Sequence, residues 1–141
     1  MATAHSDAAQ DRQVPEPDGT RPLAVVLLCA GVAMLPWLLV LANSLPATES
    51  ATWIGLDVLE ALGLAATGLL MLRRDPRGCL TATATAVLLV ADAWFDVTTA
   101  APGTELATAA AMALGVELPM AVLCAVQAVR SWPHSARRDR R

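Results

Sequence analysis

Four long apolar blocks constrain this chain more than any other feature of its sequence. Each block is long enough to cross the hydrocarbon core of a bilayer, which takes about 20 residues of α-helix. The blocks are residues 23–43, 53–72, 79–99 and 106–129. Only short connections and two polar tails remain outside them, so the 141 residues leave no room for a second domain. The sequence therefore predicts a single integral membrane domain.

The blocks have the pattern of helices rather than of barrel strands. Apolar residues run continuously through each block, whereas the wall of a membrane barrel alternates apolar and polar residues. We therefore predict an all-α fold, a polytopic bundle of four transmembrane helices that occupies residues 23–130. The stretches "ALGLAATG" and "TAAAMALG" should let helix backbones approach closely, because their side chains are small.

The arginines predict the orientation of the bundle. All ten basic residues are arginines, and they lie in the two tails and in the connection between the second and third blocks. The other two connections contain none. The positive-inside rule therefore predicts that both termini and the middle connection are cytoplasmic. The abundance of Ala and Arg without Lys suggests a GC-rich bacterial genome, so we expect a bacterial plasma membrane protein that contacts membrane lipids and no nucleic acid.

The two tails are predicted to have different roles. Residues 1–22 are polar and rich in proline, and they cannot bury enough apolar surface to fold, so we expect disorder. This long leader also argues against a cleaved signal peptide. Residues 131–141 form a basic cytoplasmic tail, in which Trp132 fits an interfacial anchor.

Histidine and cysteine give no sign of a cofactor. Both histidines lie in the tails, and Cys29, Cys79 and Cys124 have no metal-binding spacing. We therefore predict no cofactor and no resident metal. The carboxylates of "DAWFD" are nevertheless oxygen ligands of the kind that Mg²⁺ or Mn²⁺ prefers.

Five acidic residues fall inside the predicted spans, where no basic residue can neutralise them. Each ionised carboxylate at the bilayer centre costs about 2.5–3.5 kcal/mol. All five cannot be buried, charged and unpaired, so some must be protonated, hydrated or bound to a cation. The candidate catalytic residues are accordingly Asp92, Glu60, Asp96, Asp57 and Glu117.

The spacing of these acids predicts one shared cluster. Asp57 and Glu60 are three residues apart and Asp92 and Asp96 four, so each pair shares a helix face. Because a helix rises about 1.5 Å per residue, the two pairs come to similar depths on antiparallel spans. Glu117 falls near the midplane by the same count. An alternative assigns Asp57 or Asp96, taken singly, to the interface with headgroup water.

Two prolines and four aromatic residues lie at similar depths. Pro119 and Pro36 each free a carbonyl and kink a span, which is tolerated where the backbone lines a cavity or faces protein. The aromatic residues Trp37, Trp53, Trp94 and Phe95 are candidates to wall such a cavity and bind a substrate. Trp53 also fits an interfacial anchor.

Three stretches resemble the recurring blocks of a group of small actinobacterial four-helix membrane proteins without an assigned activity. They are "WIGLDVLEALGL", "ADAWFDVTTA" and "VELPMAVLCA". The resemblance implies the four-helix topology and marks Asp57, Asp92, Trp94, Asp96, Glu117 and Pro119 as characteristic positions. It implies no chemistry. A looser similarity, limited to the "ELP" kink and to acids set beside aromatic rings, links the chain to the sterol isomerase and sigma-2 receptor type of membrane domain.

Three functions are compatible with these observations. The first is acid–base or carbocation chemistry of the isomerase or cyclase type on an isoprenoid or other lipophilic substrate, with Asp92 and Glu60 as acid and base, polarised by Asp96 and Asp57. The second is a proton- or cation-coupled transporter that forms a homo-oligomer. The third is an accessory membrane subunit without catalysis. The residues do not decide whether the protein is an enzyme.

Overall fold

The structure, a computed structural model, describes residues 19–44 and 47–138. All regular elements among the described residues are helical, which confirms the predicted all-α class. Four spans are long and apolar enough to cross a membrane, as the sequence predicts. Residues 1–18, where we expect disorder, lie outside the described residues. The elements are α1 (Thr20–Ser44), α2 (Ala47–Leu72), α3 (Gly78–Thr99), α4 (Thr104–Met112), the π-helical turn η1 (Ala113–Glu117) and α5 (Leu118–Arg138).

The second and fourth spans differ from the expected helices. α2 begins at Ala47, six residues before the predicted span, so most of the expected "SLPATESA" loop is helical. Proline is tolerated at the start of a helix, and Pro46 immediately precedes this one in the sequence.

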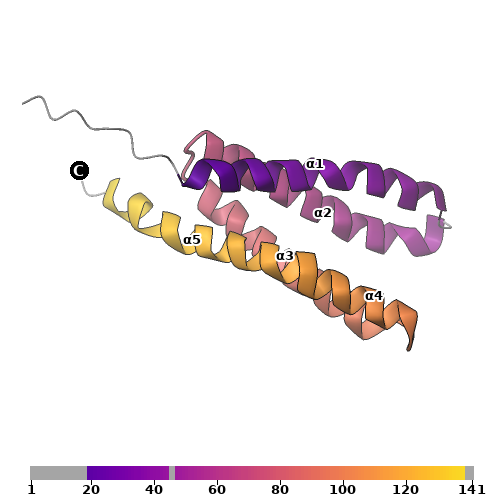
Figure 1. Ribbon diagram of the computed structural model, residues 1–141. Coiled ribbons are helices and arrows are strands. Elements are labelled where there is room, and N and C mark those ends of the chain that lie inside the picture. Colours follow the sequence, from indigo (N-terminus) through magenta and orange to yellow (C-terminus); the bar gives the residue numbers. More distant parts are fainter. Residues whose placement is uncertain (1–18, 45–46, 139–141) are drawn as a thin grey trace, which may run out of the picture.

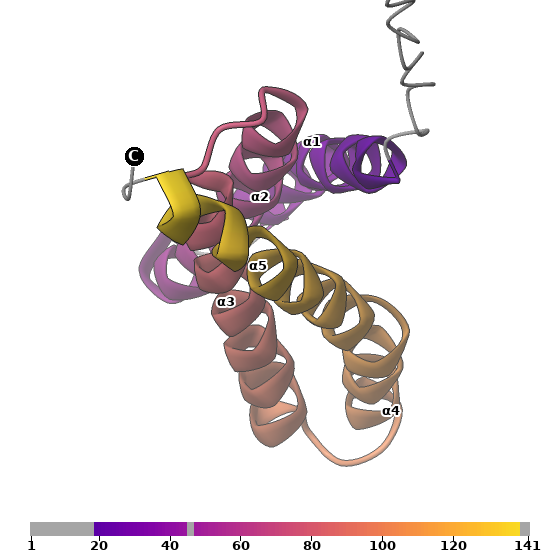
Figure 2. The ribbon, with the colours of Figure 1, turned by 90° about the vertical axis from the view of Figure 1, so that its left-hand side faces the viewer.

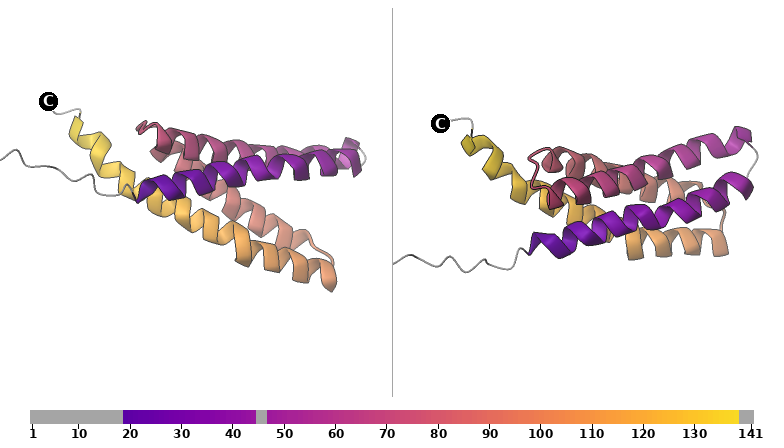
Figure 3. Two further views of the ribbon diagram at one scale, coloured as in Figure 1. Left: turned by 45° about the horizontal axis from the view of Figure 1, so that its top comes forward. Right: turned by 90° about the horizontal axis from the view of Figure 1, so that it is seen from above.

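The fourth span is a composite of α4, η1 and α5, which follow one another as one long rod (Figure 3).

The helices form two hairpins that lie at an angle to each other (Figures 1 and 2). α1 packs along α2, and α3 packs along α5, η1 and α4, while α2 and α3 hold the hairpins together. The start of α1, the α2–α3 connection and the end of α5 lie at one end of the molecule, and the end of α1, the start of α2 and the α3–α4 connection lie at the opposite end. The described arginines therefore belong to one end, as the expected topology requires.

Small residues let α1 and α2 approach closely. A Cβ atom added at Gly31 would lie 2.5 Å from the carbonyl oxygen of Ala61 and 2.8 Å from the backbone nitrogen of Ala65. One added at Gly68 would lie 2.5 Å from the carbonyl oxygen of Ala24. The expected role of "ALGLAATG" is confirmed, because its small residues make this contact.

The second small-residue stretch packs against α3. α4 and η1 both contact α3, and Ala113 is buried. α4 itself has no buried residue, and a Cβ atom at Gly115 would meet nothing within 4 Å. The contact made by "TAAAMALG" is therefore looser than the one made by "ALGLAATG".

A tight connection positions α2 against α3. Asp75 donates its backbone N–H to the carbonyl of Leu70 at 2.9 Å, and Arg74 donates to Met71 at 3.0 Å. These crossed hydrogen bonds, with Arg74 at a φ of 55°, form a Schellman motif. The Asp75 side chain then accepts a hydrogen bond from the backbone N–H of Arg77 at 2.8 Å. The connection therefore fixes the position of α3 along the axis of α2.

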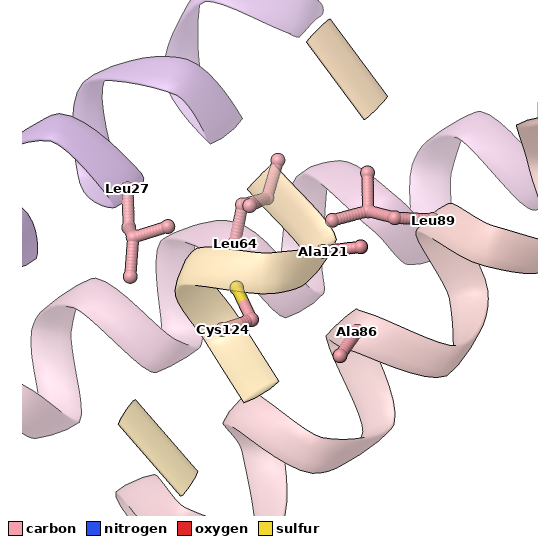
Figure 4. Close-up of a cluster of buried hydrophobic side chains, with 6 residues drawn as sticks. All are labelled: Leu27, Leu64, Ala86, Leu89, Ala121 and Cys124. Atoms are coloured by element: carbon pink, nitrogen blue, oxygen red, sulfur yellow. The ribbon is translucent and has the colours of Figure 1, made fainter. Parts of the chain in front are cut away.

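A small core joins the hairpins (Figure 4). Its buried members come from α1, α2, α3 and α5: Leu27, Leu64, Ala86, Leu89, Ala121 and Cys124. Beside it, the hydroxyl oxygens of Thr67 on α2 and Thr85 on α3 lie 3.3 Å apart, both fully buried. Thr85 also donates to the carbonyl of Thr81 at 2.8 Å, so Thr67 donates to Thr85. The hydroxyl groups of these two buried threonines are therefore both hydrogen-bonded.

The outside of the molecule is apolar. Large hydrophobic side chains point outward from every span, among them Leu39 at 66% exposure, Leu80 at 67%, Leu114 at 70% and Val129 at 73%. A water-soluble monomer rarely exposes so much continuous apolar surface. This surface and the four long spans indicate a multi-pass membrane protein.

Candidate functional site: a shared carboxylate cluster

The acidic side chains inside the spans come from three elements that meet beside the core. Helical spacing puts Asp57 and Glu60 on one face of α2, and Asp92 and Asp96 on one face of α3. Glu117 is the last residue of the π-helical turn η1, which packs against α3. Each element thus turns its acids toward the same interior region.

The carboxylates form two overlapping groups. One oxygen each of Asp57, Glu60 and Asp92 lie within 4.8 Å of one another. One oxygen each of Asp92, Asp96 and Glu117 also lie within 4.8 Å of one another. Asp92 belongs to both groups, so the five residues are one cluster, which we call the carboxylate cluster. The depth count from the sequence, which matched the two helix faces, leads to the same set of residues.

Burial divides the cluster into an inner and an outer part. Glu60 is 2% exposed, and Asp92 and Glu117 are each 7% exposed. Asp57 and Asp96 are half-buried. Since Asp57 and Asp96 lie on the side nearer the α1–α2 and α3–α4 connections, the cluster becomes more accessible toward that end of the molecule.

Two carboxylate oxygens inside the cluster lack a partner. Oε1 of Glu60 and Oε2 of Glu117 are buried and have no hydrogen-bond partner among the described residues. A buried carboxylate oxygen without a donor or a counter-charge is strongly unfavourable. Basic side chains cannot supply the partner from the interior of the spans, because residues 22–129 contain basic residues only in the α2–α3 connection. The cluster therefore needs protons, water or cations from outside the chain.

The fourth span reaches the cluster through its π-helical turn. η1 covers Ala113–Glu117, and the backbone N–H of Leu118 donates to the carbonyl of Ala113, five residues earlier. Pro119, which lacks an N–H, follows directly. The sequence predicts a kink at this place, and the structure has a wider helical turn instead. Such turns are frequent at functional sites.

The three aromatic candidates whose side chains the structure describes are largely exposed. Trp37 is 59% exposed, Trp94 68% and Phe95 50%. Each helical residue turns the chain by about 100°, so Trp94 points away from the face that Asp92 and Asp96 share, whereas Phe95 lies at the edge of that face. Trp53 belongs to α2, but its side chain lies outside the described residues. The expected aromatic wall is therefore absent from the inner face for the three aromatic side chains that the structure describes.

Pro36 lies inside α1 and is exposed, and α1 continues through it to Ser44. α1 contacts α2 and supplies no member of the carboxylate cluster. This proline is thus separate from the acids, whereas Pro119 adjoins them.

The cluster can hold protons or bind a cation through oxygen ligands alone. In comparisons with known proteins, no family model, no curated protein and no solved structure matches the chain. The function is therefore inferred from the residues of the cluster.

Proposed function

We propose that this protein is a multi-pass plasma membrane protein that binds protons and cations at its carboxylate cluster and couples their movement across the membrane. This is the proton- or cation-coupled transporter among the functions expected from the sequence. The single observation that carries the proposal is the five-acid cluster with buried, unpartnered oxygens of Glu60 and Glu117.

The energetics of the cluster support exchange rather than a fixed charge state. Each ionised carboxylate in the bilayer centre costs about 2.5–3.5 kcal/mol, and neighbouring carboxylates repel each other. A proton or a cation relieves both costs at the same place. Because the two kinds of ligand compete for the same oxygens, binding of one releases the other, which is the basic requirement for coupling.

The position of the aromatic rings weakens the case for carbocation chemistry. Aromatic faces beside the acids would stabilise a cation formed on a lipophilic substrate. Trp37, Trp94 and Phe95 instead expose half or more of their surface on the outside of the chain. Proton and cation exchange needs only the carboxylates.

The test is ion movement in proteoliposomes. Purified protein is reconstituted into liposomes that contain a pH-sensitive dye, and Mn²⁺ or Ca²⁺ is added outside. We expect a protein-dependent change of internal pH, abolished in Asp92→Asn and retained in Glu105→Gln, which changes an exposed acid on α4 outside the cluster. Equal traces with protein-containing and empty liposomes would contradict the proposal.

Acid–base chemistry on a lipophile has one observation in its favour. Glu60 and Asp92, the acid and base expected from the sequence, are both buried and have oxygens within 4.8 Å. Its test is a comparison by mass spectrometry of lipid extracts from cells that produce the natural protein or Glu60→Gln. A lipid that changes only with the active protein would favour catalysis over transport. Co-purification of a stoichiometric membrane partner would favour the accessory subunit.

A further inference from the structure

The ligand atoms of the carboxylate cluster restrict which cation it can take. All members of both groups are Asp or Glu, and no histidine or cysteine of the described residues belongs to either group. Carboxylate oxygens suit hard cations such as Mg²⁺, Mn²⁺ and Ca²⁺, whereas thiolate and imidazole select softer metals. A divalent ion also offsets two negative charges at once, which a monovalent ion does not.

The spacing of the oxygens suits one ion in each group. Two oxygens on opposite sides of Ca²⁺ are about 4.6–5.2 Å apart, and on opposite sides of Mg²⁺ about 4.0–4.2 Å apart, from the usual metal–oxygen distances. Oxygens on adjacent corners are closer. In each group three oxygens from three residues lie within 4.8 Å of one another. One ion can therefore lie between them once the side chains close around it.

The buried oxygens give an independent reason to place an ion here. Oε1 of Glu60 and Oε2 of Glu117 are shielded from solvent and lack a donor among the described residues. Glu60 belongs to one group and Glu117 to the other, and both side chains are more than nine-tenths buried. One cation in each group would therefore give both groups of ligands a counter-charge.

We propose that the carboxylate cluster binds divalent hard cations of the Mn²⁺ and Ca²⁺ class at two overlapping positions that share Asp92. One position is held by Asp57, Glu60 and Asp92, and the other by Asp92, Asp96 and Glu117. This inference rests on the proposed function, since it names the cation that exchanges with protons. Half-buried Asp57 and Asp96 stand at the accessible side, where an ion first meets the cluster.

The shared ligand makes the test specific. Full-length protein in detergent micelles is titrated with Mn²⁺, and free Mn²⁺ is followed by electron paramagnetic resonance. We expect the natural protein to bind two Mn²⁺ ions, in competition with Ca²⁺. Asp57→Asn and Glu117→Gln should each lose one ion, because each removes a ligand from one group only. Asp92→Asn should lose both ions.

Controls separate a lost site from a lost fold. Glu105→Gln should bind as the natural protein does, and Asp92→Glu, which keeps the carboxylate, should recover binding. Circular dichroism checks that Asp92→Asn keeps its helices. If Asp92→Asn misfolds, the comparison of Asp57→Asn with Glu117→Gln still decides the proposal, because each must lose one ion.

Three outcomes would overturn the inference. They are no Mn²⁺ binding to the natural protein, full binding by Asp92→Asn, and loss of both ions in Asp57→Asn. Proton movement in proteoliposomes without Mn²⁺ binding would reject this inference and leave the proposed function standing. Mn²⁺ binding without ion movement would reject the proposed function and leave the cation sites standing.

Discussion

A carboxylate oxygen of Asp92 on α3 lies within 4.8 Å of one from Glu60 on α2, and both side chains are more than nine-tenths buried. The two helices are joined by a short connection closed by crossed hydrogen bonds. This acidic contact between the hairpins is thus built on adjacent, antiparallel helices, where the energetic coupling of the two acids can be measured.

Asp92 and Glu60 should be strongly coupled in a double-mutant cycle. In metal-free buffer, Glu60→Gln and Asp92→Asn should each raise the free energy of unfolding, since each removes one member of a repelling pair. The increase in the free energy of unfolding of the double variant should be smaller than the sum of the two single increases, by about 1 kcal/mol or more. The effects of substitutions at contacting residues are not additive. Denaturant unfolding in detergent, followed by circular dichroism, provides the measurement. Strictly additive effects would mean that the acids do not interact.

The contact between α1 and α2 should not tolerate a methyl group. Gly31→Ala and Gly68→Ala would each place a Cβ atom 2.5 Å from a backbone oxygen, so each should destabilise the protein by about 1–3 kcal/mol. Gly55→Ala is the matched control on α2, where a Cβ atom meets nothing within 4 Å. That variant should be neutral or stabilising by up to about 1 kcal/mol, from helix propensity. Thermal unfolding in detergent compares the three.

The threonine contact between α2 and α3 should contribute measurably to stability. Thr85→Val keeps the side-chain shape but leaves the buried hydroxyl of Thr67 without its acceptor at 3.3 Å. We expect a loss of about 0.6–2 kcal/mol, the range for hydrogen bonds between membrane helices. Thr83→Val is the control, since the exposed Thr83 bonds only to the carbonyl of Cys79 in its own helix. Similar losses in both variants would refute an interhelical contribution.

Pro119→Ala should remove one cation position and keep the other. The restored backbone N–H allows a regular α-helix to form in place of η1. A change of one residue in register turns a side chain by about 100°, which would take Glu117 away from Asp92. The Mn²⁺ titration should then show one bound ion instead of two, with helix content unchanged. Two bound ions would show that the π-helical turn is not needed to place Glu117.

Cysteine labelling tests the predicted orientation. In a variant whose three native cysteines are replaced by alanine, Arg77→Cys and Thr104→Cys place single thiols at opposite ends of the molecule. A membrane-impermeant maleimide added to intact bacterial cells should label Thr104→Cys and leave Arg77→Cys unlabelled until the cells are lysed. The opposite pattern would reverse the predicted topology.

The residues of the candidate site could be predicted because helix geometry is local. The rise per residue was enough to match Asp57 with Asp96 and Glu60 with Asp92, and the i,i+3 and i,i+4 spacing put them on shared faces. Helix geometry could also have predicted the direction of the Trp94 ring. Trp94 is two residues from Asp92, about 200° around the helix, and so it had to face away from the acids.

The arrangement of the hairpins could not be predicted from local patterns. It depends on contacts between the two hairpins, such as that of Thr67 on α2 with Thr85 on α3. For the same reason the small residues of α4 do not show how closely this helix packs: α4 contacts α3 but has no buried residue. Pro119 was the sequence feature that indicated the π-helical turn. A proline predicts that a helix is irregular at that place but not which type of irregularity forms.

The closed α2–α3 connection has a consequence for how such a chain can diverge over evolution. The connections before α2 and after α3 contribute no member of the carboxylate cluster, so their length can change without altering the acids. An insertion between Leu72 and Gly78 would break the crossed hydrogen bonds and shift Asp92 relative to Glu60 by about 1.5 Å for each residue of slippage. Relatives that keep the five acids should therefore keep this connection at constant length, while their other connections vary.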